Sequence, residues 1–193
     1  MGKINPIEIK GLWDKGYSID KHSQGSTYIG EDPFGHPRFD TDRTLIGQYM
    51  YELKYLGKVN RIKKIVELIT PFLDSWDVMK EIDVVLPVPP SNTNRAFQPV
   101  PGIAHEIAAY LNKAYADNIL LKTSELQLKN FDSTDKAKME HTITVSKKAK
   151  RKYSALIIDD IYDTGKTLND AVTALRTDNN LVNIYVLTMT KKR

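Results

Sequence analysis

The sequence contains no cysteine, and this absence excludes several kinds of protein at once. A disulfide framework, a zinc ribbon, an iron–sulfur cluster and a thiol nucleophile all depend on that residue. Long apolar runs are missing too, since no stretch approaches the roughly 18 residues that a membrane-spanning helix requires. Residues 1–8 also lack the apolar segment of a signal peptide. We therefore expect a soluble, cytoplasmic protein with no membrane partner.

What the sequence does contain is sufficient for a folded core. Its 193 residues suit one domain, or one domain with a small appendage. Hydrophobic residues make up 41% of the chain and charged residues 27%, which is typical of a globular protein and not of a disordered one.

The net charge of +4 is distributed unevenly. Residues 1–146 contain 18 basic and 19 acidic residues, whereas residues 147–193 contain 10 and 5. The surplus lies in two clusters, residues 147–152 and 191–193. A solvated surface explains such clusters, and contact with an anion is the alternative. Aromatic residues are not interleaved with them except at Tyr153, so nucleic acid is not expected as a direct ligand.

Turn-forming glycine and proline residues divide the chain into two parts. They are frequent in residues 1–43, between short β-prone pieces, which predicts a small hairpin-like appendage or hood. Residues 44–193 form the core. There the apolar spacing predicts helices over 45–56 and from Asn60 to a boundary before Pro71. Further along, strands are predicted over 82–88, 118–121, 153–159 and 181–188, and helices over 103–111 and 168–175.

This alternation of strands and helices predicts an α/β fold, with a mostly parallel sheet flanked by helices. Ligands of such sheets bind beyond the carboxyl ends of the strands. At one such end Gly165-Lys166-Thr167 suggests a P-loop, but the Walker A pattern needs a glycine where Asp160 stands. Three aspartates, at positions 159, 160 and 163, would also face the triphosphate. We therefore reject a P-loop.

The same segment suits a ligand that is part sugar and part phosphate. Backbone N–H groups of residues 163–167, at a helix N-terminus, can hold a terminal phosphate with help from the Thr164 and Thr167 hydroxyls. Gly165 lets the backbone approach closely. The Asp159 and Asp160 carboxylates can accept hydrogen bonds from ribose hydroxyls or hold Mg²⁺. An ordinary strand-to-helix turn with acidic caps is the alternative.

Residues 155–168, Ala-Leu-Ile-Ile-Asp-Asp-Ile-Tyr-Asp-Thr-Gly-Lys-Thr-Leu, resemble the phosphoribosyl pyrophosphate (PRPP) motif of type I phosphoribosyltransferases. Residues 52–57 resemble the "LKY-x-G" segment of ComF-like members of that superfamily, and residues 82–89 resemble their strand ending in Pro-Val-Pro. The similarity covers about residues 45–190. Three features depart from the ComF-like pattern: the N-terminal zinc ribbon is absent, Ala96 replaces the glycine of "RGFNQ", and Asp163 stands where many members have threonine.

The resemblance implies a type I phosphoribosyltransferase-like, Rossmann-like fold and assigns roles to particular residues. Those that would bind PRPP are Asp159, Asp160, Asp163, Thr164, Gly165, Lys166 and Thr167. Those that would bind pyrophosphate are Pro89, Pro90, Ser91, Asn92 and Arg95. A structural polar loop is the alternative for the second set. Asp163, as general base, and Arg95 would be catalytic, and Asp159 and Asp160 would hold Mg²⁺ directly or indirectly.

Residues 122–146 lack a clear period, which is typical of a functional loop or of disorder. In the family a long hood closes over PRPP, and Lys129, Lys136 and Lys138 would then screen the leaving group. The basic residues 147–152 would add positive potential near the same site. A homodimer is implied by the family alone.

The function expected from the resemblance is transfer of a 5-phosphoribosyl group from Mg²⁺-PRPP to a nitrogen of a nucleobase-like acceptor. The acceptor pocket would include residues 1–43, where Tyr17, Tyr28 and Phe34 could stack on a base. Two alternatives stay open. One is a PRPP- or nucleotide-binding regulatory module without catalysis, and the other is an accessory protein of DNA uptake.

Overall fold

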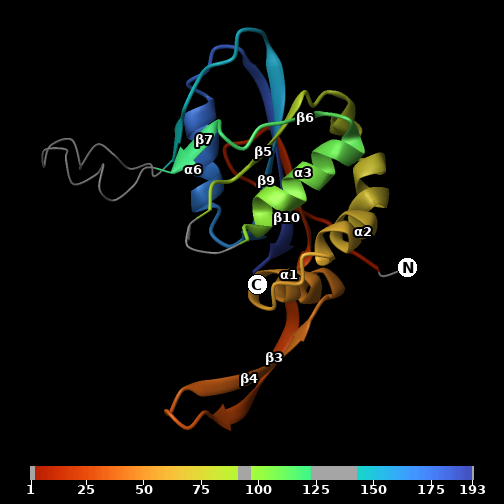
Figure 1. Ribbon diagram of the computed structural model, residues 1–193, viewed down its shortest axis with the longest axis vertical. Helices are drawn as coiled ribbons and strands as arrows, with labels where there is room; N and C mark the ends of the chain where they lie inside the picture. Colours follow the sequence, from red (N-terminus) through yellow and green to blue (C-terminus); the bar gives the residue numbers. More distant parts are fainter. Residues whose placement is uncertain (1–2, 91–96, 123–142, 193) are drawn as a thin grey trace, which may run out of the picture.

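A six-stranded sheet forms the centre of the protein in the computed structural model, which describes residues 3–90, 97–122 and 143–192 (Figure 1). The strand order is β1-β2-β10-β9-β5-β6, and every neighbouring pair is parallel except β1 with β2. The strands are β1 (Ile7–Glu8), β2 (Lys15–Lys21), β5 (Val84–Pro87), β6 (Ala114–Tyr115), β9 (Tyr153–Tyr162) and β10 (Leu181–Lys191). The expected mixed α/β fold with a mostly parallel sheet is confirmed.

Helices cover both faces of this sheet. The first face carries α1 (Leu45–Tyr55), α2 (Arg61–Ser75) and α3 (Pro99–Leu111), with a short 3₁₀ turn, η1 (Asp77–Lys80), after α2. The opposite face carries α6 (Lys166–Leu175). None of the helices in the described ranges is long and apolar enough to cross a membrane.

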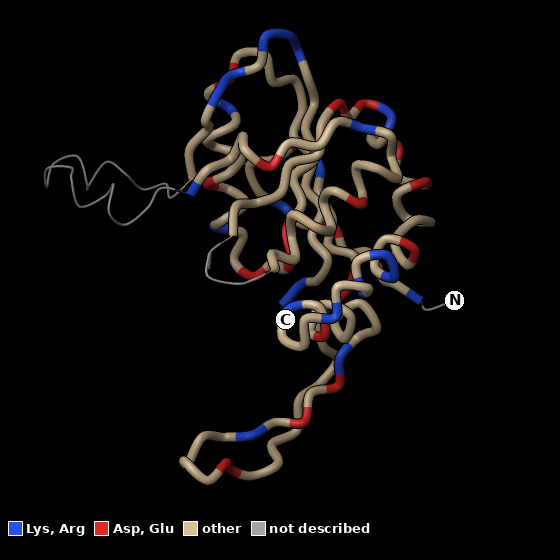
Figure 2. The backbone as a smooth tube through the Cα atoms, viewed as in Figure 1, with Lys and Arg blue, Asp and Glu red and all other residues tan. Residues whose placement is uncertain are grey.

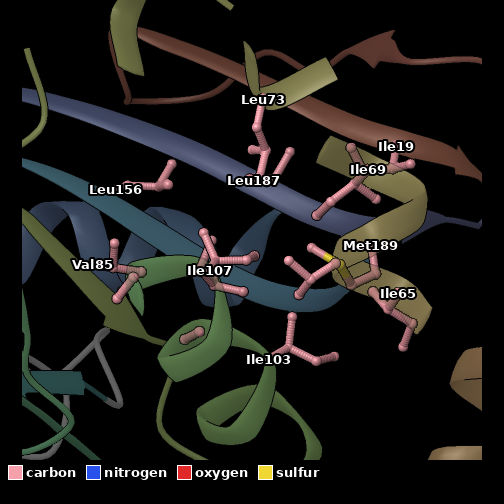
Figure 3. Close-up of a cluster of buried hydrophobic side chains, with 14 of the residues drawn as sticks. Ile19, Ile65, Ile69, Leu73, Val85, Ile103, Ile107, Leu156, Leu187 and Met189 are labelled. Atoms are coloured by element: carbon pink, nitrogen blue, oxygen red, sulfur yellow. The ribbon is translucent and has the colours of Figure 1, made fainter. Parts of the chain in front are cut away.

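The alternation of side chains along β9 explains why the sheet has two cores. Leu156 and Ile158 point into the cluster formed with α1, α2 and α3, whereas Ala155 and Ile157 point into the cluster formed with α6. Figure 3 shows the first cluster, in which isoleucines of α2 and α3 meet Leu156 and Leu187 of the sheet. A strand buried on both faces needs a nearly continuous apolar run, and residues 155–158 supply it.

The first two helices begin where the sequence predicts, but α2 ends later. Thr44 caps α1 by accepting a hydrogen bond from the Gly47 N–H at 3.1 Å. The boundary predicted before Pro71 is wrong, because α2 continues through that proline to Ser75. The buried stripe that includes Ile69 and Leu73 extends past the proline, so tertiary packing holds the last turn in helical form.

Residues 1–43 divide between the sheet and a projecting hairpin. The hairpin consists of β3 (Ser23–Glu31) and β4 (Pro37–Arg43), which extend away from the body beyond the end of β2 (Figure 1). β2 itself lies within the main sheet beside β10, where the sequence analysis placed no strand. The predicted strand 118–121 contributes β7 (Leu120–Lys122), which pairs with β8 (Ile143–Val145) in a separate ribbon.

Candidate functional site

A cavity of about 320 Å³ lies at the carboxyl ends of β5 and β9, where a parallel sheet is expected to bind its ligand. One wall is the end of β9, the following loop and the start of α6, residues 159–168. The opposite wall contains Pro89 and Pro90 after β5 and the first residues of α3. Lys54 of α1 completes the lining.

Two adjacent carboxylates, Asp159 and Asp160, form the acidic end of the lining segment 159–168. The Asp160 backbone N–H donates to Asp159 Oδ1 at 2.8 Å. Burial, and then the negative charge of Asp160, raise the pKa of the Asp159 carboxyl above its usual range. The positive charge of Lys54 lowers the pKa of Asp159. Lys54 is held nearby, because its Nζ donates a hydrogen bond to Asp160 Oδ2 at 2.6 Å. The acidic end is therefore partly neutralised by an ammonium group from another element.

Lys54 lines the cavity, and the sequence analysis assigned it no role. Its helical spacing is equally typical of an amphipathic surface, and Asp160 lies 106 positions away along the chain. The resemblance of residues 52–57 to a family segment was the available signal.

The other end of this lining segment is the N-terminus of α6. Gly165 is the N-cap and has a φ of 78°, a left-handed conformation that glycine adopts most readily. A Cβ atom at this position would lie 3.0 Å from the Tyr162 ring. The first N–H groups of a helix have no partner within it, and residues 165–168 line the cavity. This end is therefore suited to an anion.

Asp163 lies on the loop between the two ends and is exposed. Lys192 engages its carboxylate, with an Nζ–Oδ2 distance of 2.9 Å, and the Lys192 backbone N–H donates to the Tyr162 carbonyl at 2.8 Å. Part of the C-terminal basic cluster therefore lies at the cavity.

The other basic cluster lies elsewhere. Residues 147–152 precede β9, whereas the cavity lies beyond Ile158, towards its end. At roughly 3.3 Å per residue, the eight positions from 152 to 160 span about 25 Å. Figure 2 shows these basic residues at the opposite end of the sheet from the C-terminus. The expectation that they add positive potential near the site is wrong.

The structure brings most of the described predicted site residues together. The lining includes Pro89, Pro90, Asp159, Asp160, Asp163, Thr164, Gly165, Lys166 and Thr167. Ser91, Asn92 and Arg95 lie outside the described residues, as do Lys129, Lys136 and Lys138. Of the three aromatic residues proposed for the acceptor pocket, Tyr17 packs against Phe72 and Trp76, with its ring centroid 5.3 Å from the centroid of each. Tyr28 and Phe34 lie on the β3–β4 hairpin and are not among the lining residues that the structure describes.

Two adjacent carboxylates of the cavity, those of Asp159 and Asp160, could bind a metal ion. Within residues 3–90, 97–122 and 143–192, no group of three or more histidine or acidic side chains is placed to hold one. Mg²⁺ commonly binds through one or two carboxylates, with waters and substrate oxygens completing its shell. The pair of Asp159 and Asp160 fits that ligand set.

Comparison with known proteins gave structural matches only. No family model matches the sequence, and neither does any curated protein. The adenine phosphoribosyltransferase of Trypanosoma brucei is 12% identical, with 97% of this chain and 87% of that chain covered and a TM-score of 0.45. The orotate phosphoribosyltransferase of Aeropyrum pernix is 14% identical, with 85% of this chain and 72% of that chain covered and a TM-score of 0.43. The UMP synthase of Leishmania donovani is 15% identical with a TM-score of 0.40; 83% of this chain aligns, but it spans only 28% of that protein.

Proposed function

We propose that this protein binds PRPP in the cavity at the carboxyl ends of β5 and β9 and transfers its 5-phosphoribosyl group to a nitrogen acceptor. The observation that supports this proposal is the arrangement of residues 159–167. This continuous segment begins with two carboxylates and ends with a helix N-terminus, and all of these residues line the cavity. Ribose 5-phosphate likewise has hydroxyl donors in one part and a phosphate in another.

Each end would recognise one part of the ligand. The α6 N-terminus, with the Thr164 and Thr167 hydroxyls, would hold the 5-phosphate. Asp159 and Asp160 would accept hydrogen bonds from the ribose hydroxyls, with Lys54 fixing the Asp160 carboxylate. Asp159 and Asp160 would also hold Mg²⁺, which when bound would supply positive charge for the departing pyrophosphate.

The reaction would exchange one bond at C1 for another. The bond from C1 to the pyrophosphate oxygen breaks, the pyrophosphate leaves with the electron pair, and the acceptor nitrogen forms a bond to C1. Most of the rate enhancement would come from positioning and from stabilising the charge of the leaving group. Asp163 would take the proton from the acceptor nitrogen. The pyrophosphate roles of Ser91, Asn92 and Arg95 stay predictions.

A binding module without catalysis is the second candidate, and the ion pair of Asp163 favours it. Its carboxylate would have to leave Lys192 before it could take a proton from an acceptor. A ComF-like assignment is also part of the proposal, supported by the place of Lys54 at the cavity. The homodimer and the nucleobase-like nature of the acceptor stay predictions.

Calorimetric titration of PRPP with and without Mg²⁺ tests the proposal. We expect the wild type to bind and Asp159→Asn/Asp160→Asn to bind at least about tenfold more weakly, a difference of about 1.4 kcal/mol. The matched control is Asp40→Asn/Asp42→Asn on the exposed strand β4, which should retain wild-type affinity. Absence of binding by the wild type would contradict both candidates. Pyrophosphate release across a panel of nucleobases then distinguishes a transferase from a module.

A further inference from the structure

A second cavity, of about 370 Å³, lies at the amino end of the sheet and shares no lining residue with the first. Its apolar lining comes from β5, β6 and the turn after β6: Val84, Leu86, Ala114, Ala116 and Ile119. Leu86 also belongs to the core on the α6 side of the sheet. Cavities of small-molecule sites are commonly about 300–1,000 Å³ and mostly apolar. The size and lining of this one suit a small ligand.

The basic loop before β9 forms the rim of this cavity. Lys147, Lys148, Lys150 and Arg151 all line it, and Asp83 is the only acidic residue among the described lining. The Asp83 carboxylate already accepts a hydrogen bond from the Ser154 backbone N–H at 2.8 Å. Within the part of the chain that the structure describes, no ion pair involves Lys147, Lys150 or Arg151. The rim therefore carries a net positive charge.

The rim loop is held in place through the two peptide groups of Ala149. Its N–H donates to Asp178 Oδ2 at 2.7 Å, and its carbonyl accepts from Asn180 Nδ2 at 2.8 Å. The Tyr153 hydroxyl donates to the same Asp178 oxygen at 3.3 Å. A solvated run of lysines does not need such anchoring. The cations are presented from a fixed backbone beside an apolar surface.

The geometry points to a small organic anion as the occupant of this cavity. We propose that its apolar body lies on Val84, Leu86 and Ile119, and that its phosphate, sulfonate or carboxylate group faces Lys150 and Arg151. An extended nucleic acid fits less well, because Tyr153 is the single aromatic residue among the described lining residues and successive bases need more than one ring on which to stack. This site is independent of the proposed transferase function.

The fluorescent probe anilinonaphthalene sulfonate combines an aromatic body with an anion and tests the site directly. We expect the folded wild type to bind it, and Lys150→Glu/Arg151→Glu to weaken binding at least about tenfold. Ala116→Leu, which fills the apolar lining, should weaken it as well. The control variant Lys63→Glu/Lys64→Glu, on the exposed side of α2, changes the net charge by the same amount as the rim variant. It should leave the affinity for the probe within about twofold of the wild type.

Competition then defines the ligand chemistry. Phenyl phosphate should displace the probe at a concentration at least about tenfold lower than inorganic phosphate, because only the former supplies an apolar body. Equal potency of the two would overturn the proposal. It would also be overturned if the α2 variant lost as much affinity as the rim variant. Displacement of the probe by saturating ribose 5-phosphate would place the probe at the first cavity and overturn the proposal too.

Discussion

The two ends of the central sheet carry side chains of opposite charge, and they differ in whether those side chains form ion pairs. At the carboxyl end, Lys54 pairs with Asp160 and Lys192 pairs with Asp163, so each of these acids has a cation close by. At the amino end, cations gather around an apolar cavity whose described lining contains one acid, Asp83. The net charge of +4 is therefore a poor guide to ligands. The two proposals accordingly assign the two ends to ligands of different kinds, a sugar phosphate with Mg²⁺ at the carboxyl end and a small organic anion at the amino end.

The carboxyl end also depends on a left-handed backbone conformation, which none of the described lining residues of the amino-end cavity adopts. Gly165 adopts a positive φ where the backbone must turn into α6 beside the cavity. The basic rim at the amino end relies on hydrogen bonds from Asp178 and Asn180 to Ala149. Substitutions that strain the backbone should therefore harm the first site and leave the second intact.

Gly165→Ala should have the largest effect on the carboxyl end. A Cβ in the left-handed region costs roughly 1–2 kcal/mol, and here it also meets the Tyr162 ring at 3.0 Å. We expect PRPP affinity to fall by about a hundredfold, because the N–H groups that would hold the phosphate are displaced. Calorimetry measures the affinity, and urea unfolding measures the stability.

The matched control is Gly35→Ala at the tip of the hairpin. Gly35 has a φ of 82°, and nothing lies within 4 Å of a Cβ placed there. It should lose only the roughly 1–2 kcal/mol that the left-handed conformation costs, and it should retain PRPP affinity. If both variants bind PRPP equally well, Gly165 has no role in phosphate binding.

The sequence anticipates the carboxyl end better than the amino end, and the reason is physical. The apolar run of residues 155–158 is typical of a strand buried on both faces, and a strand that leads into a glycine-containing turn and a helix is a local pattern. Lys54 and Lys192 reach the site only through the tertiary fold, so the spacing of residues around them does not identify them, and only the family resemblance of residues 52–57 points to Lys54. The strand β2 is missed because Ile19 is its single large apolar residue that is fully buried.

The position of residues 147–152 could have been predicted correctly. They precede the strand whose far end carries the aspartates, and a strand separates the residues at its two ends. The second cavity, in contrast, needs β5 and β6 to pack beside the loop before β9. Long-range pairing of this kind leaves no local sequence pattern.

Lys54→Met should destabilise the protein by about 1–3 kcal/mol at neutral pH, because a partly buried acidic pair loses its cation. The pKa of Asp159 is already raised by burial and by Asp160, and the variant raises it further. A raised folded-state pKa means that the folded protein binds more protons than the unfolded chain, so this contribution to stability improves as the pH falls. The difference between variant and wild type should therefore shrink on acidification.

Lys150→Met at the amino end is the matched control for this prediction. Its cation has neighbouring lysines and no ion pair with another described residue, so its removal should not lower the free energy of unfolding. Urea unfolding of both variants over a range of pH values measures the contrast. Equal destabilisation by the two substitutions would show that the ends of the sheet do not differ in charge compensation.

Lys192→Ala should have the smallest effect on stability among the substitutions at the carboxyl end. Its ion pair with Asp163 is exposed, with 64% and 53% of the two side chains accessible, and exposed pairs contribute little. We expect a change in unfolding free energy below about 0.5 kcal/mol and PRPP affinity within about twofold of the wild type.

Asp163→Asn should likewise retain PRPP affinity but lose pyrophosphate release, since it removes the proposed proton acceptor. Release at the wild-type rate from Asp163→Asn would show that this carboxylate takes no part in the reaction, and its pairing with Lys192 would then be structural only.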